Sequence, residues 1–370
     1  MVHLPRAKST ARATQNGFVI DAAENIPLEV TRAYADVLRY RELVDLAKEN
    51  YVLHRQTSEQ INERVAAGVG RRVDSEQASG RLALAESNLL TELSNLHDVN
   101  ARYLRLVGEV APTKLGALPA KLKLRGQAAT VQKALETAYL NNPAINAAIE
   151  NVDAQRAQVD ARKAAYAPRL DFRLRQGYER NQNGITGNYL DTSAQIVLNY
   201  NLYRGGSDQA RELQAARAVN QALDLQEKAC RDTRQTVMIA YNDIKKIDEQ
   251  LGYLDQHRLS TEKSREAYRQ QFDIGQRTLL DLLDTENELL TARLSNVNAD
   301  TDLSLAYLRT YAGMGTLLEY LGLQRLDTAT PESKDLAEID PAQLCPNDPV
   351  ALDRYDRDQL NAKAAALTAT

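Results

Sequence analysis

The sequence predicts a mainly α-helical protein built from long antiparallel helical hairpins, as in an α-barrel or coiled coil, with one β-hairpin inserted between helices. Three observations predict this class. Long stretches without Gly or Pro carry apolar residues at helical spacing, one segment alternates between apolar and polar residues, and one tip motif occurs twice. The composition agrees, because the chain is rich in Ala, Leu, Gln, Glu and Arg and has 17 Gly and 10 Pro in 370 residues.

The composition also excludes several function classes. A formal net charge of −4 and the lack of a basic stripe with interleaved aromatics argue against nucleic-acid binding. Cys230, Cys345 and four scattered histidines have no metal-ligand spacing, so neither a metal nor a cofactor is expected. We find no nucleophile–base pair and no phosphate-binding Gly loop, which disfavours an enzyme.

The first half of the chain predicts one helical hairpin, residues 25–111. Residues 1–24 are polar and without a clear period, so we expect an irregular N-terminus. A helix should begin at Pro27 and end before Gly68-Val69-Gly70, because both glycines break a helix. The return helix, about Asp74–Val107, precedes a basic linker at 112–129.

The second half, residues 130–324, opens with helices. Asn142 should cap a helix whose first residue is Pro143, since Pro is favoured at that position and Asn just before it. Pro168 should stop this helix, because the residue before a proline is disfavoured in a helix.

Residues 169–203 then change to a period of two. The predicted strands are Leu170–Tyr178 and Ala194–Tyr203, joined by the polar loop Arg180–Thr192. Each strand has about ten residues, one apolar face and one polar face, the pattern of a strand between lipid and water. A soluble amphipathic hairpin lying on a helix has the same pattern, so both interpretations stay open here.

A second long helical hairpin follows at 207–312. Its first helix should end near Ile274, Gly275 should form the tip, and the return helix should reach about Tyr311. Residues 325–370 are rich in Asp, Pro and Ala without an apolar period, and we expect a flexible tail.

The two helical hairpins are related by an internal repeat. Ala33-Tyr34-x-Asp36 and Ala240-Tyr241-x-Asp243 lie 207 residues apart, and so do Gly68 and Gly275 and the acids Asp74 and Asp281. Unrelated amphipathic helices would not share the break and the acid six residues beyond it, which indicates a duplication. The first copy is incomplete, because a helix and β-hairpin precede the long helix in the second copy alone.

Four motifs in this order carry a family resemblance. They are Asn142-Pro143, Tyr166-Ala167-Pro168, Leu202-Tyr203-Arg204-Gly205-Gly206 and the run from Ile274 to Asp284. Over about residues 22–324 the chain resembles the TolC family of outer-membrane efflux and secretion channels. The resemblance implies a homotrimer, with strands in outer-membrane lipid and helices in a periplasmic tunnel, that acts as a passive conduit. It also implies a periplasmic adaptor protein at the helical tips and, through it, an inner-membrane ABC or RND pump.

The run around Gly275 is most similar to family members that serve type I protein secretion, rather than drug or metal efflux. The resemblance assigns adaptor docking to the tip residues Gly68, Val69, Gly275 and Gln276. It assigns an entrance gate to Asp281, Asp284, Arg277, Asp74 and Phe272.

Within this gate, Asp281 and Asp284 match an acidic ring, and Arg277 and Asp74 match a polar network that holds the entrance shut. Phe272 stands where some members have a Tyr, so the latch is expected to be weaker or built differently. A solvated acidic cluster at a helix start, near the positive end of the helix dipole, is the alternative for the two aspartates.

The expected location is the outer membrane, with the tunnel in the periplasm. No apolar stretch of about 18 residues is present, and residues 1–18 lack the apolar core of a secretory signal peptide. Because one β-hairpin is present where the family has two, we expect an N-terminally truncated chain. The alternatives are a soluble coiled-coil scaffold and a non-functional fragment; a periplasmic adaptor is disfavoured because it would need a β-rich half.

Overall fold

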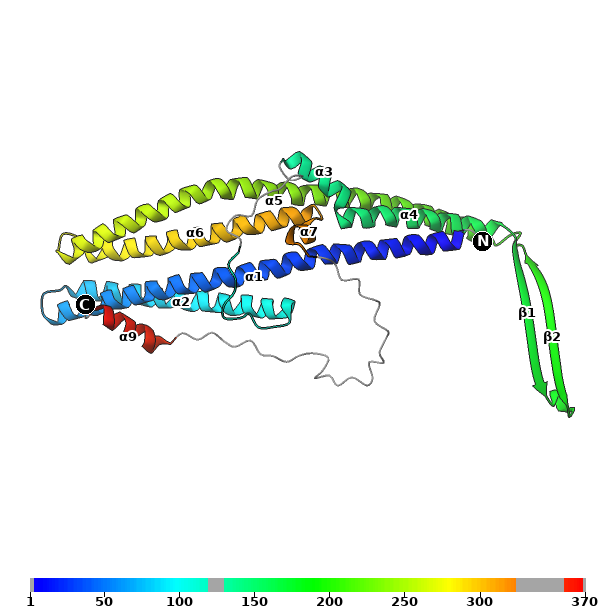
Figure 1. The fold of residues 1–370 in the computed structure, drawn as a ribbon, viewed down its shortest axis with the longest axis horizontal. Coiled ribbons are helices and arrows are strands. Elements are labelled where there is room, and N and C mark those ends of the chain that lie inside the picture. Colours follow the sequence, from blue (N-terminus) through cyan, green and yellow to red (C-terminus); the bar gives the residue numbers. More distant parts are fainter. Residues whose placement is uncertain (1–2, 119–129, 324–355, 369–370) are drawn as a thin grey trace. The chain divides into compact units, whose positions relative to one another are not determined.

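The computed structural model describes residues 3–118, 130–323 and 356–368, which are mainly helical and contain one two-stranded sheet (Figure 1). This confirms the predicted fold class. The chain divides into two compact units, one of residues 23–138 and 235–370, the other of residues 1–22 and 139–234. Parts of the predicted linker (119–129) and tail (324–355, with Cys345) lie outside the described residues.

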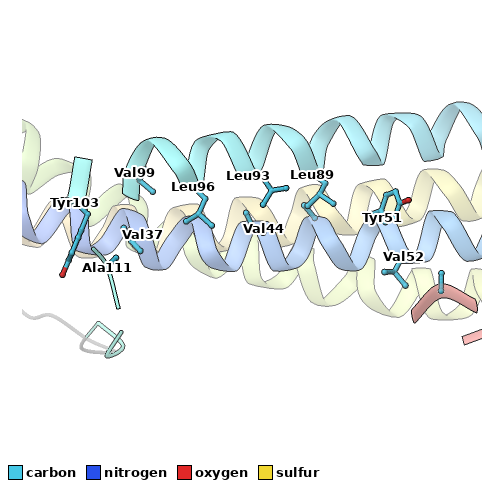
Figure 2. Close-up of a cluster of buried hydrophobic side chains, with 13 residues drawn as sticks. Val37, Val44, Tyr51, Val52, Leu89, Leu93, Leu96, Val99, Tyr103 and Ala111 are labelled. Carbon is cyan, nitrogen blue, oxygen red and sulfur yellow. The ribbon is translucent and has the colours of Figure 1, made fainter. Parts of the chain in front are cut away.

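Helices α1 (His3–Ala66) and α2 (Arg72–Val107) form the first helical hairpin, and α1 belongs to the larger unit from residue 23 onward. Apolar side chains from both helices interlock along its length (Figure 2). On α1 and α2 they are Ala33, Val37, Val44, Ala47, Tyr51, Val52, Leu89, Leu93, Leu96, Val99 and Tyr103. Several of them recur every seven residues, which keeps one stripe of each helix facing the other.

The predicted irregular N-terminus is wrong from His3 onward, because α1 already begins there and continues through Pro27. A periodic apolar pattern indicates a helix that packs against another element, and residues 3–24 have no such pattern. Their helix formers, such as Ala, Arg and Lys, therefore did not lead to a helix prediction. Pro27 removes one backbone donor from the helix, and the Thr31 hydroxyl donates to the Pro27 carbonyl at 2.6 Å.

The second hairpin consists of α5 (Ser207–Asp273) and α6 (Leu279–Gly313), of which α5 contributes residues 235–273 to the larger unit. The short helix α7 (Leu317–Leu321), which was not predicted, follows α6. Its Tyr320 stacks on Tyr311 of α6 with ring centroids 3.9 Å apart. Near the C-terminal end of α6, residues of α3 (Val131–Asn141), α5, α6 and α7 share one apolar cluster, to which α1 adds Ala35.

A helix in the C-terminal segment corrects a second prediction. Residues 325–370 were expected to be flexible, but α9 (Arg357–Thr368) is helical and packs on α1. Its start is capped, since the Asp356 carboxylate accepts from the backbone N–H groups of Asp358 at 3.0 Å and Gln359 at 3.2 Å. Leu360 and Ala364 provide one apolar pair, too short a pattern to reveal an amphipathic helix.

The smaller unit contains α4 (Pro143–Lys163), the 3₁₀ turn η2 (Ala164–Tyr166) and the sheet. The Asn142 side chain accepts hydrogen bonds from the backbone N–H groups of Ala144 at 3.0 Å and Ile145 at 3.4 Å. Pro143 is the first helical residue. The predicted cap is therefore confirmed.

The β-hairpin pairs β1 (Arg169–Arg180) with β2 (Asn188–Asn199) in antiparallel register. The predicted second strand, Ala194–Tyr203, starts and ends too late. The connecting loop is shorter than expected because Asn181 closes it, by accepting from the Gly187 N–H at 3.1 Å with its side chain and donating its own N–H to the Gly187 carbonyl. The polar residues after Gly187 therefore pair in the sheet.

The register places the apolar side chains of both strands on one face. Opposite pairs are Leu170 with Leu198, Phe172 with Ile196, Leu174 with Ala194 and Tyr178 with Leu190. These large side chains are exposed in the single chain, for example 74% for Ile196. Among the described helices, none combines the length and the apolar character needed to cross a membrane.

Candidate entrance and docking site at the hairpin tips

The two helical hairpins end in the same backbone turn. Gly68 and Gly275 have φ of 75° and 77°, a left-handed conformation that favours glycine. The Gly68 N–H donates to the Val65 carbonyl and the Val69 N–H to the Arg64 carbonyl, both at 3.0 Å. These two hydrogen bonds form a Schellman motif, which satisfies backbone carbonyls that a helix end leaves without partners.

The second tip repeats this pattern with matching residues. The Gly275 N–H donates to the Phe272 carbonyl at 2.9 Å, and the Gln276 N–H donates to the Gln271 carbonyl at 2.8 Å. The predicted equivalence of the two tips is thus present in the backbone geometry.

The tips expose apolar side chains. Val69 is 81% exposed, and the neighbouring Val73, Ile274 and Leu280 are also exposed. A β-carbon added to Gly68 or Gly275 would meet no atom within 4 Å, so both glycines face open space. Exposed apolar groups around two rigid turns suit contact with a partner protein.

Phe272 lies inside the molecule. It is 7% exposed and packs with Ile61 of α1, Ala78 of α2 and three leucines of α6. The Arg64 guanidinium lies 5.3 Å from its ring centroid, a cation–π distance. Phe272 therefore joins the two hairpins near their tips by apolar packing.

Asp281 caps the helix α6. The Thr278 hydroxyl accepts from the Asp281 N–H at 3.3 Å, and the Asp281 carboxylate accepts from the Thr278 hydroxyl at 2.8 Å and from its N–H at 3.3 Å. This is a capping box, which satisfies free donors at a helix start. The hydrogen bonds from Thr278, with Arg277 nearby, hold the pKa of Asp281 below its usual value.

Asp284, one turn further along α6, forms an ion pair with Arg81 of α2. The pair connects the first hairpin to the second. Sequence reasoning missed Arg81, although it follows Asp74 by seven residues and so lies on nearly the same face of α2.

Arg277 and Asp74 bind local partners in the single chain. Arg277 donates to the Gln271 side chain at 2.9 Å and lies 4.3 Å from the Tyr268 ring centroid. Asp74 accepts from Arg71, the residue before α2, at 3.1 and 3.2 Å. The structure does not bring Arg277 and Asp74 together.

Further polar contacts cross from α1 to α6 behind the tips. Arg39 donates to Asp302 at 2.8 Å. Arg293 donates to Glu49 at 3.3 Å and also to Glu262 of α5 at 2.8 Å. We call the four contacts between the hairpins the polar seam: Arg39–Asp302, Glu49–Arg293, His54–Asn287 and Arg81–Asp284.

The His54–Asn287 contact is the most buried part of the polar seam. His54 is 2% exposed, and its Nε2 lies 3.3 Å from the Asn287 Oδ1. Its Nδ1 is buried without a hydrogen-bond partner. Burial, with a smaller contribution from Arg81, lowers the pKa of His54 from 6.5 to about 4.

Within the described residues, no group of three His, Cys, Asp or Glu side chains is arranged to hold a metal ion. The polar groups at the tips form ion pairs and caps.

Comparison with solved structures identifies the fold. The chain superimposes on the outer-membrane channel OprN with a TM-score of 0.74 at 19% identity, over 85% of this chain and 71% of that one. The fold is therefore that of an outer-membrane channel.

Sequence comparison identifies related proteins. Residues 134–316 match the family model described as "Outer membrane efflux protein". The outer membrane protein TolC of Vibrio cholerae serotype O1 is 26% identical over 327 residues, 85% of this chain and 71% of the relative. The alkaline protease secretion protein AprF of Pseudomonas aeruginosa is 27% identical over 306 residues, 79% of this chain and 62% of the relative.

Over most of its length the chain is thus similar to TolC-like outer membrane efflux proteins, in agreement with the resemblance seen in the sequence. Its relatives are outer membrane channel proteins rather than enzymes. The chain spans 62–71% of the length of these proteins.

Proposed function

We propose that this chain is an outer-membrane channel subunit of a tripartite export system and acts as a passive conduit for type I protein secretion. Two equivalent tips with exposed apolar residues carry the proposal, because they supply a repeated docking surface at the end of long helices. The similarity to AprF, which is named for the secretion of a protease, favours protein cargo over drugs or metal ions.

In this proposal the chain forms a homotrimer. A periplasmic adaptor protein docks on Gly68, Val69, Gly275 and Gln276, and an inner-membrane ABC or RND pump supplies the energy through the adaptor. The channel itself carries out no chemistry. Cargo then depends on the width and charge of the tunnel and on the partner proteins.

The proposed entrance gate contains Asp281, Asp284, Arg277, Asp74 and Phe272. Asp284 has a defined latch partner, Arg81, because this ion pair connects the two hairpins. Phe272 supports the latch by packing between them. The capping box of Asp281 supports the alternative, in which Asp281 is an acid that stabilises the start of α6. Its carboxylate nevertheless adds negative charge beside the tip.

The test is reconstitution of the purified chain in planar lipid bilayers. We expect a conducting trimer that prefers cations, and a clear loss of this preference in the double variant Asp281→Ala/Asp284→Ala. Asp224→Ala, which removes an exposed acid from α5 far from the tips in sequence, should leave the preference unchanged. An absence of conductance in the unvaried chain would contradict the channel, whereas an unchanged preference in the double variant would contradict the gate alone.

Cargo needs a separate experiment. Cells that lack their own channel of this class should regain secretion of a type I substrate protein when they express this chain with a matching adaptor and pump. Restored efflux of a small dye without protein secretion would instead identify a drug channel.

A further inference from the structure

The C-terminal helix α9 lies against the first hairpin. Ala364 is 0% exposed and belongs, with the half-buried Leu360, to the apolar cluster of α1 and α2. The Tyr51 hydroxyl of α1 donates to the Asn361 side chain at 3.0 Å. Residues 360, 361 and 364 lie on one face of a helix, so α9 uses a single face for this contact.

The contact lies near the middle of the polar seam, where the two hairpins meet through polar side chains and a cavity is present. Apolar clusters that combine residues of both hairpins occur around Ala35 and around Ile61. Between these levels, the contacts Glu49–Arg293 and His54–Asn287 are polar. A cavity of about 290 Å³ is also present there, lined by side chains of α1, α5, α6 and α9.

Lys363 of α9 lines this cavity. The other charged residues in its wall are three acids, Glu49, Glu262 and Glu286, and two bases, Arg265 and Arg293. Without α9 the wall would carry one excess negative charge, which Lys363 balances. In a partly enclosed site such a balance matters more than on an open surface.

We propose that α9 is a strap that ties hairpin α1–α2 to hairpin α5–α6 at the middle of the polar seam. One face of α9 anchors on α1, and Lys363 lines the cavity whose wall holds acids of α1, α5 and α6. The anchoring surface is small, so the strap can release without unfolding either hairpin. In the proposed channel, release would let the hairpins separate more easily; this consequence rests on the proposed function, whereas the strap itself does not.

Amide hydrogen exchange on the full chain tests the strap. An isolated helix of 12 residues is marginal in water, so α9 should be protected from exchange only while it is docked. Ala364→Glu places a charge in the buried contact. We expect exchange at least about tenfold faster in α9, and also faster in residues 46–53 of α1 and 286–293 of α6.

Ala362→Glu is the matched control, because Ala362 is an exposed residue of the same helix. It should leave the exchange of all three segments unchanged. Lys363→Gln, a change at an exposed position that cannot unfold the hairpins, should speed exchange in α9 severalfold at low salt and less at high salt.

Three results would overturn the strap. They are an unprotected α9 in the unvaried chain, equal effects of Ala364→Glu and Ala362→Glu, and an effect of Ala364→Glu that spares residues 286–293. The last result would show that α9 binds the first hairpin alone.

Discussion

At the scale of single residues, His54 is a neutral imidazole enclosed between two hairpins. The pKa of His54 is lower in the folded chain than in the unfolded chain. As the pH falls below 6.5, His54 is therefore protonated in the unfolded chain before it is protonated in the folded chain. Stability is thus unaffected above pH 6.5 and decreases as the pH falls from 6.5 toward 4. From pH 7.5 to 4.5 we expect His54 to remove about 2–3 kcal/mol of unfolding free energy.

The measurement is chemical denaturation of the chain and of His54→Gln at both pH values. His54→Gln should lose less stability on acidification, by about the same 2–3 kcal/mol. His257→Gln, which changes an exposed histidine of α5, should follow the unvaried chain. Equal pH dependence of His54→Gln and the unvaried chain would show that His54 is accessible to protons.

The capping box of Thr278 and Asp281 can be tested by substitution of Thr278. Thr278→Ala removes the hydroxyl that accepts from the Asp281 N–H and donates to its carboxylate, and should lower the unfolding free energy by about 1 kcal/mol. It should also raise the pKa of Asp281, because these hydrogen bonds are the main cause of its lowering. Carbon-detected NMR titration of the carboxylate measures this shift.

Thr291→Ala is the control for the cap. Thr291 lies within α6, where its hydroxyl donates to the Asn287 carbonyl, so its loss should be nearly neutral or slightly stabilising. If both threonine variants had the same stability, the capping box would contribute nothing.

The site could be predicted from the sequence only where its parts are local. Asp281 and Asp284 are one helical turn apart, and this spacing is visible in the sequence. Arg81 is 203 residues from Asp284, and helix packing alone brings them together. Phe272 was interpreted as a changed latch residue, but its burial depends on α1 and α2, which no local pattern reports.

At the scale of elements, the tips depend on glycine, and two glycines of the same helical hairpin give a matched test. Gly275→Ala forces a side chain into a φ of 77°, which should cost about 1–2 kcal/mol of unfolding free energy. Gly252→Ala lies inside α5, with nothing within 4 Å of the added carbon, and should stabilise by about 1 kcal/mol. Thermal unfolding followed by circular dichroism measures both changes, and opposite signs are required.

The same elements explain which parts of the fold were predictable. Gly68 and Gly275 act through their own backbone, and the Asn142 side chain bonds to residues two and three positions ahead, so these local signals determine where helices end or begin. The start of β2 and the helix α9 depend on a loop closure and on packing against α1. The first contact is a hydrogen bond within a loop and the second joins residues far apart in sequence, and a search for local periods detects neither.

At the scale of the whole molecule, the repeat and the β-hairpin together indicated the fold class, because each constrains a long stretch of chain. The hairpin exposes one apolar face, formed by side chains that pair across β1 and β2. In an outer membrane protein this face is the one that can meet lipid. The opposite face of the same strands then meets water.

Ile196 and Val197 test this arrangement, because they are adjacent aliphatic residues of β2 on opposite faces. Ile196→Lys should weaken membrane insertion by about 2–4 kcal/mol, the cost of a lysine on a lipid-facing strand near the bilayer centre. Val197→Lys should have little effect on membrane insertion, because Val197 lies opposite Asp171, whose carboxylate can form an ion pair with the new lysine. Flotation of each variant with liposomes measures the bound fraction; equal binding of the two variants would mean that the apolar face of the hairpin does not meet lipid.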